Sequence, residues 1–166
     1  MTISLRPATL DDAEAVVLLH LQCHEEAYGR HLPPEFFEER RKSLPGRVES
    51  FRKAMELGNV PTLAYDGGGL VGVAESGPAQ EDDAPVSLEL RWIYTLERVH
   101  GTGAGQALSD AVIGTQAAYL WVLEDNPRAQ AFYVRNGFVP DGARKLMNEQ
   151  WHFLPNIRMV RAAVNA

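Results

Sequence analysis

The sequence has little cysteine, no long apolar run and no excess of positive charge. Its single cysteine, Cys23, excludes an intrachain disulfide and fits a reducing compartment. No segment approaches the roughly 18 uninterrupted apolar residues of a membrane-spanning helix, and the N-terminal stretch lacks the basic and apolar regions of a secretory signal. We therefore expect a cytoplasmic protein with no membrane partner.

The net charge and the absence of repeats further limit the kind of protein that this sequence encodes. The net charge of -6 argues against nonspecific binding to nucleic acid and slightly favours cationic ligands such as amines. The chain also lacks internal repeats and low-complexity linkers, so nothing in it marks a domain boundary. With 166 residues, 45% of them hydrophobic, the sequence predicts a single domain over residues 1–166 with one well-buried core.

The most informative feature that is present is a glycine-rich loop within residues 88–108. A run typical of a β-strand leads into glycines at 101, 103 and 105 and then into a helix-forming segment. Glycine lets the backbone approach a ligand and adopt positive φ, so successive N–H groups can converge on anionic oxygens at a helix N-terminus. The layout therefore predicts a phosphate-binding loop.

Two common phosphate-binding patterns do not fit this loop. The dinucleotide pattern G-x-G-x-x-G, started at Gly101, requires glycine or alanine where the chain has Gln106. The P-loop pattern requires Gly-Lys-Ser/Thr, which is absent here. A nucleotide-binding α/β protein is thus a weaker alternative, and a simple tight turn before a helix is another.

A second motif follows about twenty residues later. Asn126 is a favourable N-cap for a helix whose first residue is Pro127, and Gly137 is a favourable residue to end it. These signals predict a helix over residues 127–136. Helical spacing places Tyr133 on the apolar side of that helix, so we expect its ring to point inward.

Apolar periodicity and turn residues predict the remaining elements. Thr9 is expected to cap the first helix, Gly67 and Gly68 to form a hairpin turn, and residues 80–85 to form an acidic loop. Strands are predicted at residues 3–5, 61–66, 69–76, 87–96 and 151–161, and a further strand is predicted to end at residue 123. Further helices are predicted at residues 10–28, 35–41, 46–57 and 104–113.

Both motifs resemble those of the GNAT superfamily of N-acetyltransferases. The loop from His100 to Gly105 is similar to that family's pyrophosphate loop, Gln/Arg-x-x-Gly-x-Gly/Ala, and departs from it at His100. The stretch from Asn126 to Phe138 fills every fixed position of the family pattern N-x-x-A-x-x-x-Y-x-x-x-G-F. The two motifs lie at the spacing the family uses.

The resemblance implies an α+β fold with α/β/α layers. Its mixed, mostly antiparallel twisted sheet has fourth and fifth strands that splay apart to admit the pantetheine arm of coenzyme A. It also implies an N-acetyltransferase that uses acetyl-CoA as cosubstrate and no metal. The primary amine would attack the thioester directly in a ternary complex, so Cys23 would not be a nucleophile.

Residue roles also follow from the resemblance. The backbone N–H groups of Ile93, Tyr94 or Thr95 would bind the oxyanion. Tyr133, whose phenol has an ordinary pKa of about 10, would protonate the leaving thiolate. The residues expected to contact the coenzyme are Ile93, Tyr94, Thr95, His100, Gly101, Thr102, Gly103, Ala104, Gly105, Gln106, Asn126 and Tyr133.

The general base is harder to assign. Some relatives place a glutamate at the position that Trp121 occupies here, so that version is absent. Glu89 alternates with leucines in the strand before the loop and is the preferred candidate for the general base. The alternative is that Glu89 is an exposed strand residue with no catalytic role. Other groups could act through water. They are Glu75, Glu124, His24 and His31.

The acceptor is expected to meet the first helices, which in this superfamily form one wall of its site. The substrate-binding candidates are His24, Tyr28 and His31, with Phe36 and Phe37 beside them. Residues 28–33 are loosely similar to small-amine acetyltransferases that act on polyamines, so a small amine is expected. Protein N-termini or lysines and amino acids are alternative acceptors, and a longer acyl chain is an alternative to acetyl. A noncatalytic acyl-CoA-binding regulatory domain is the alternative function. Both a monomer and a homodimer are compatible with the sequence.

Overall fold

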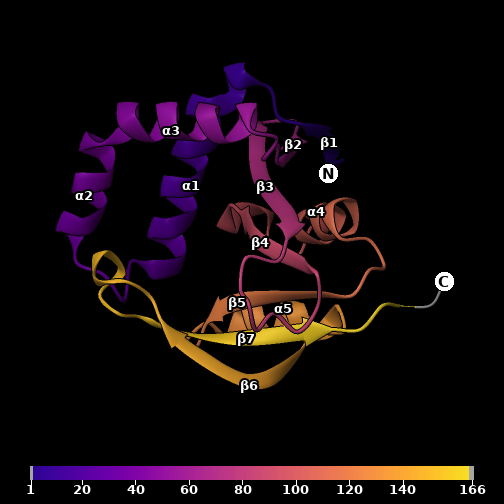
Figure 1. The fold of residues 1–166 in the computed structure, drawn as a ribbon. Coiled ribbons are helices and arrows are strands. Elements are labelled where there is room, and N and C mark those ends of the chain that lie inside the picture. The colour runs from indigo at the N-terminus through magenta and orange to yellow at the C-terminus, as the bar shows by residue number, and fades with distance from the viewer. Residues whose placement is uncertain (1, 165–166) are drawn as a thin grey trace. The chain divides into compact units, whose positions relative to one another are not determined.

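A computed structural model describes residues 2–164 (Figure 1). Its helices are α1 (Ala13–Tyr28), α2 (Pro34–Lys42), α3 (Leu44–Glu56), α4 (Ala104–Val112) and α5 (Pro127–Arg135). Its strands are β1 (Ser4–Pro7), β2 (Thr62–Asp66), β3 (Gly69–Pro78), β4 (Leu88–Thr95), β5 (Ala118–Leu123), β6 (Val139–Leu146) and β7 (Pro155–Arg161). Short 3-10 turns lie at Leu10–Asp12, Glu97–Val99 and Glu149–Trp151.

The strands form a seven-stranded sheet in the order β1-β2-β3-β4-β5-β7-β6. Pairing is antiparallel for β1–β2, β2–β3, β5–β7 and β6–β7, and parallel for β4–β5. The parallel register consists of one pair, Glu89 with Tyr119, as expected for strands that diverge. The mixed, mostly antiparallel sheet predicted by the resemblance is confirmed.

The chain divides into two compact units. The first comprises the residues up to Glu75 together with Ile93–Val112, and the second comprises Ser76–Trp92 together with the residues from Ile113 onward. The single domain inferred from the sequence stays a prediction. No helix within residues 2–164 has the length and apolar character needed to cross a membrane.

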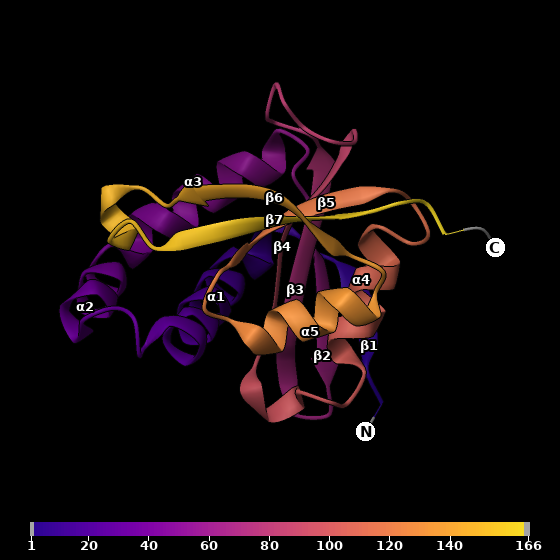
Figure 2. The same cartoon turned by 90° about the horizontal axis from the view of Figure 1, so that it is seen from below.

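In the first unit, α1 and α3 lie on one side of β2 and β3, and α4 lies on the other (Figures 1 and 2). Thr9, predicted to cap the first helix, instead caps the 3-10 turn Leu10–Asp12 that precedes α1, and the Asp12 carboxylate accepts from the backbone N–H of Thr9 at 2.7 Å. Ala13 and Val17 of α1 pack with Val48 of α3 in a buried cluster, so the apolar stripe of α1 holds the helical layer together.

In the second unit, α5 runs beside β5 and β7 (Figure 2). The sequence analysis was wrong about the C-terminal strands, because it missed β6 and began the last strand at Trp151, which belongs to a 3-10 turn. Strand β6 contains Pro140 and Gly142, is mostly exposed and shifts register between Pro140 and Arg144. A strand of this composition lacks the apolar alternation by which strands are predicted.

Candidate active site

The glycine loop of the first unit connects β4 to α4. Gly101 and Gly103 have φ of 78° and 94°, and a Cβ atom built on either would meet nothing within 4 Å. The backbone face is therefore open, and α4 starts directly after it at Ala104 with no acidic residue in its first turn. Glycines at positive φ just before a helix N-terminus are typical of anion-binding loops, so this backbone geometry is compatible with an anionic ligand.

Two side chains brace this loop from within. The Nε2 atom of His100 lies 3.2 Å from the carbonyl oxygen of Thr95, which requires a proton on Nε2 because a carbonyl can only accept. The hydroxyl of Thr102 donates to the carbonyl of Val99 at 2.7 Å. His100, which departs from the family pattern, thus ties the loop to the end of β4.

Gly72 on β3 is a site residue that sequence analysis missed. A Cβ there would lie 2.9 Å from Leu108 Cδ1, 3.0 Å from Thr95 Cγ2 and 3.1 Å from the carbonyl oxygen of Tyr94. The missing side chain therefore lets α4 and the end of β4 pack closely against β3. The sequence feature that could have identified Gly72 is a glycine inside a predicted strand, because such a glycine often marks the close approach of a neighbouring group.

The end of β4 also meets the imidazoles of α1. The Tyr94 ring packs edge-on against His20 at 5.1 Å and against His24 at 4.9 Å between ring centroids. The Tyr28 ring lies 5.7 Å from His24. Burial lowers the pKa of His24 to about 2 and that of His20 to about 4, with smaller contributions from neighbouring charged groups. Both rings are therefore neutral at pH 7.

The structure thus brings His24 and Tyr28 together with Tyr94, and adds His20, which the sequence analysis did not name. The sequence does contain a sign of this, because His20 lies four residues before His24 and therefore on the same face of α1. The third acceptor candidate, His31, lies in the turn after α1, where its Nε2 accepts from Arg30 Nε at 3.1 Å. With a pKa near 2, His24 is a poor general base.

In the second unit, Asn126 and Tyr133 occupy the predicted positions on α5. The Asn126 side chain accepts from the backbone N–H of Ala129 at 3.1 Å, so it caps the helix. The Tyr133 ring is buried and packs edge-on against Phe132 and Phe138, at 5.4 and 5.8 Å. The inward direction predicted for Tyr133 is confirmed.

The end of the signature motif has a structural explanation of its own. Gly137 has φ of 83°, and a Cβ there would lie 3.5 Å from the side chain of Arg161. Arg161 donates to the carbonyls of Gly114 and Gln116 at 2.8 and 2.9 Å, and its guanidinium lies over the Phe138 ring. These contacts hold the C-terminal end of α5 to β7.

Glu89, the preferred base, is paired across the strands with Tyr119. Tyr119 is fully buried, and burial together with the carboxylates of Glu89 and Glu81 raises the pKa of its phenol to about 12. The Oε2 atom of Glu89 is buried without a hydrogen-bond partner among residues 2–164. A carboxylate oxygen in this state can accept a hydrogen bond from a polar ligand.

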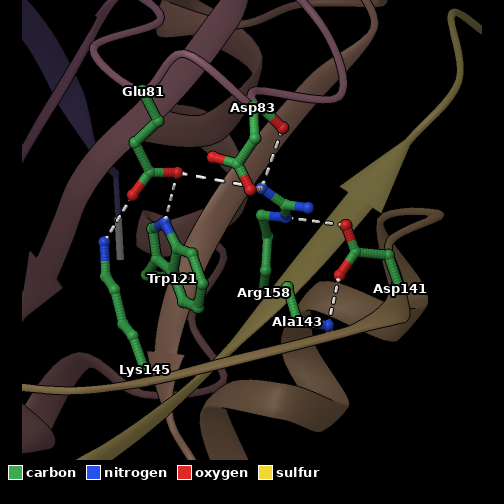
Figure 3. A network of polar contacts seen from close by, with 7 residues as sticks. All are labelled: Glu81, Asp83, Trp121, Asp141, Ala143, Lys145 and Arg158. Atoms are coloured by element: carbon green, nitrogen blue, oxygen red, sulfur yellow. Dashed lines mark hydrogen bonds and ion pairs between the residues drawn. The ribbon is translucent and has the colours of Figure 1, made fainter.

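Trp121 occupies the position where some relatives carry a glutamate. Trp121 donates from Nε1 to Glu81 of the acidic loop at 3.0 Å, and Lys145 binds the other carboxylate oxygen of Glu81 at 2.6 Å (Figure 3). Arg158 donates to Asp141 at 2.7 Å and to the Asp83 carbonyl at 3.2 Å. Glu81 thus reaches the same position from a loop, where both of its carboxylate oxygens are bonded, one to Trp121 and the other to Lys145.

Two other groups named in the sequence analysis are poor reactants here. Glu124 binds the guanidinium of Arg144 at 2.9 and 3.0 Å, which lowers the pKa of its carboxyl. Burial raises the pKa of the Cys23 thiol to about 12, so the thiolate is scarce at neutral pH. Neither a base at Glu124 nor a covalent step at Cys23 is favoured.

Comparisons with known proteins show which family has this fold and this glycine loop. The family model described as an acetyltransferase (GNAT) domain matches residues 59–140, which include the loop and α5. The chain is also 42% identical over 69 residues to a Mycobacterium tuberculosis protein named as an uncharacterized N-acetyltransferase. That match covers 38% of this chain and 43% of the relative, so it spans less than half of the relative's length.

Solved structures match over nearly the whole chain. A GCN5-related N-acetyltransferase from Rhodopseudomonas palustris has a TM-score of 0.72 and 19% identity, covering 98% of this chain and 96% of that one. PaiA N-acetyltransferase from Thermoplasma acidophilum, solved with coenzyme A, has a TM-score of 0.67 and 15% identity, covering 98% and 99%. At these identities the likeness shows the fold. Together with the family model, it confirms the resemblance to the GNAT acetyltransferases.

Proposed function

We propose that this protein is an acetyl-CoA-dependent N-acetyltransferase that acetylates a primary amine by direct attack within a ternary complex. The observation that carries the proposal is the open glycine loop, where two glycines at positive φ precede the unblocked N-terminus of α4. A pyrophosphate fits that surface, whereas the loop lacks the lysine that a P-loop uses for nucleoside triphosphates.

The proposed chemistry uses three groups. Backbone N–H groups of Ile93, Tyr94 or Thr95 stabilise the oxyanion that forms when the amine attacks the thioester carbonyl. Tyr133 gives its phenolic proton to the departing thiolate of coenzyme A. Glu89 takes the proton that the amine loses, directly or through water, and its buried oxygen supports this role.

Calorimetric titration with acetyl-CoA, coenzyme A and ATP in parallel tests the proposal, followed by a free-thiol release assay over a panel of amines on the same sample. We expect acetyl-CoA and coenzyme A to bind more tightly than ATP, and an amine to release thiol. Binding without release by any amine would indicate a noncatalytic acyl-CoA-binding domain. Absence of binding to either form of the coenzyme would refute the proposal.

The acceptor panel also separates the alternative acceptors. It contains small amines, amino acids, and peptides with a free N-terminus or lysine. Preference for a peptide would identify a protein N-terminal or lysine acetyltransferase. Preference for a small amine would match the expectation drawn from residues 28–33.

A further inference from the structure

A hollow between α1 and α3 in the first unit has no role in the chemistry described so far. Its volume is about 670 Å³, and Val17, Phe51 and Ala54 supply the apolar part of its lining, called its floor below. The polar side chains that line it are His20, Ser43, Arg47 and Ser50. An apolar floor with a few convergent polar groups is typical of small-molecule sites.

The charge facing this hollow is positive. Arg47 is half-buried, and burial alone lowers the pKa of its guanidinium, with no carboxylate opposing that effect. Arg40 on α2 does not line the hollow, but it is a second cation near Arg47, and burial together with repulsion by Arg47 lowers its pKa to about 10. His20 is neutral at pH 7, so it neither adds to this charge nor repels an ammonium group.

Nearby carboxylates do not neutralise Arg47. Within residues 2–164, no acidic side chain lies within ion-pair distance of its guanidinium. Glu49 of α3 is instead 3.6 Å from Lys53, Glu39 of α2 is 2.7 Å from Lys42, and Glu25 of α1 binds Arg41. A half-buried guanidinium without a carboxylate is costly unless a ligand supplies the anion.

The start of α3 strengthens this positive character. The first turn of α3 contains no acidic residue, and Ser43, its N-cap, makes no side-chain capping bond. The Ser43 hydroxyl instead donates to the carbonyl of Arg40 at 3.2 Å. The partial positive charge of the helix N-terminus therefore adds to the charge of Arg47.

The hollow adjoins the end of β4 through His20, whose ring packs 5.1 Å from that of Tyr94. A molecule anchored at Arg47 and passing His20 would extend toward the strand end at which acetyl transfer is proposed. We propose that the acceptor is an amino carboxylate whose carboxylate binds Arg47 and whose apolar part lies on Val17 and Phe51. This inference rests on the proposed acetyltransferase function.

The expected acceptor thus differs from a polyamine. A polyamine would bring additional positive charge next to Arg47 and Arg40, which repel it. In an amino carboxylate with an apolar side chain, the carboxylate matches the charge of Arg47 and the side chain matches the apolar floor. Its amine is not repelled by the neutral imidazole of His20. The inference therefore replaces the small-amine expectation drawn from residues 28–33 with a narrower substrate class.

The first test compares L-amino acids with their C-terminal amides, which keep the amine and replace the carboxylate by a neutral group. We expect kcat/KM in the thiol-release assay to favour the acids at least about tenfold. Arg47→Ala should lower kcat/KM for the acids by about 10- to 100-fold and change it for the amides by less than about twofold. Arg47→Lys should retain part of the preference.

Arg52→Ala is the matched control, because Arg52 lies on the same helix, is exposed and donates to the Leu10 carbonyl outside the hollow. It should leave the ratio of acid to amide unchanged. Equal losses for acids and amides in Arg47→Ala, or a preference of the unmodified protein for amides or spermidine, would overturn the inference.

A second measurement does not depend on catalysis. Phenylglyoxal modification is followed by mass spectrometry with sodium phenylacetate or phenylacetamide at equal ionic strength. Phenylacetate should slow the modification of Arg47 and leave Arg52 unaffected, whereas phenylacetamide should protect neither. Lack of protection of Arg47 would overturn the anion site. Protection without thiol release from any amine would retain the anion site and refute the acetyltransferase proposal.

Discussion

Several side chains in this protein combine a packing role with a chemical one. Tyr133 packs its ring against Phe132 and Phe138, yet only its hydroxyl is needed for proton donation. Glu89 pairs with Tyr119 in the sheet register, yet its Oε2 atom has no hydrogen-bond partner within residues 2–164. Substitutions that keep the shape of the side chain and remove the reactive atom therefore separate the two roles.

Tyr133→Phe is expected to lower kcat by about 100-fold, because general acid catalysis contributes roughly 10²- to 10⁴-fold. The ring packing is retained, so acetyl-CoA affinity measured by calorimetry should change little. Steady-state kinetics at saturating substrates measure the effect. Unchanged turnover, with chemistry shown to be rate-limiting, would remove Tyr133 from the mechanism.

Glu89→Gln is expected to reduce kcat/KM most at low pH. Below its pKa the amine is mostly protonated, so a base is needed most there, whereas at high pH the amine is already neutral. The profile of kcat/KM against pH measures the effect. Glu49→Gln, on exposed α3, is the control and should keep the original profile. A Glu89→Gln profile parallel to that of the unmodified protein would exclude Glu89 as the base.

At the scale of elements, the junction of β4, the glycine loop and α4 depends on backbone geometry more than on side chains. Gly72 allows β3 to pack closely against α4 and the end of β4, and Gly103 leaves open the space that a side chain would fill. The carbonyl of Gly103 accepts from Ala107, so this residue is also where α4 begins. The same glycine thus serves the helix and the proposed ligand surface.

Gly103→Val is expected to weaken acetyl-CoA binding at least about tenfold, because a branched side chain would cover the surface that the pyrophosphate approaches. Gly58→Val is a matched control, because Gly58 has a similar φ of 98° and is equally open, but lies after α3. Both variants should lose about 1–2 kcal/mol of unfolding free energy from backbone strain. Calorimetric titration should show the affinity loss in Gly103→Val alone, and equal affinities in the two variants would refute the loop assignment.

At the scale of the whole molecule, binding and stability are linked. A ligand that binds only the folded chain at about 100 times its Kd adds about 2.7 kcal/mol to the free energy of unfolding. For a chain of this size, that corresponds to a rise in Tm of roughly 5–10 °C. The size of the rise therefore reports which ligand the folded chain prefers.

Thermal unfolding with acetyl-CoA, coenzyme A or ATP at equal concentration should give large rises for the first two and a smaller one for ATP. ATP lacks the pantetheine arm that the diverging strands β4 and β5 are proposed to bind. A rise with ATP equal to that with acetyl-CoA would indicate a general nucleotide-phosphate site instead.

The sequence by itself determined the features that depend on neighbouring residues. The N-cap at Asn126, the positive φ of Gly101 and Gly103, and the hairpin at Gly67 follow from local backbone preferences, and the structure confirms their positions. The spacing of the two motifs was also enough to indicate the family, which the family model confirms.

Only the tertiary structure decided the features that depend on residues far apart in the chain. Strand β6 is a strand because it pairs with β7, although Pro140 and Gly142 do not favour one. The acidic loop is held by Arg158, some 75 residues later, and Gly72 is needed because Leu108 packs on it. His20 and His24 are neutral because folding buries them. In the part of the chain that the structure describes, Arg47 has no carboxylate partner, because Glu25, Glu39 and Glu49 pair with other cations. Such burial and pairing arise from long-range contacts, which local sequence patterns do not encode.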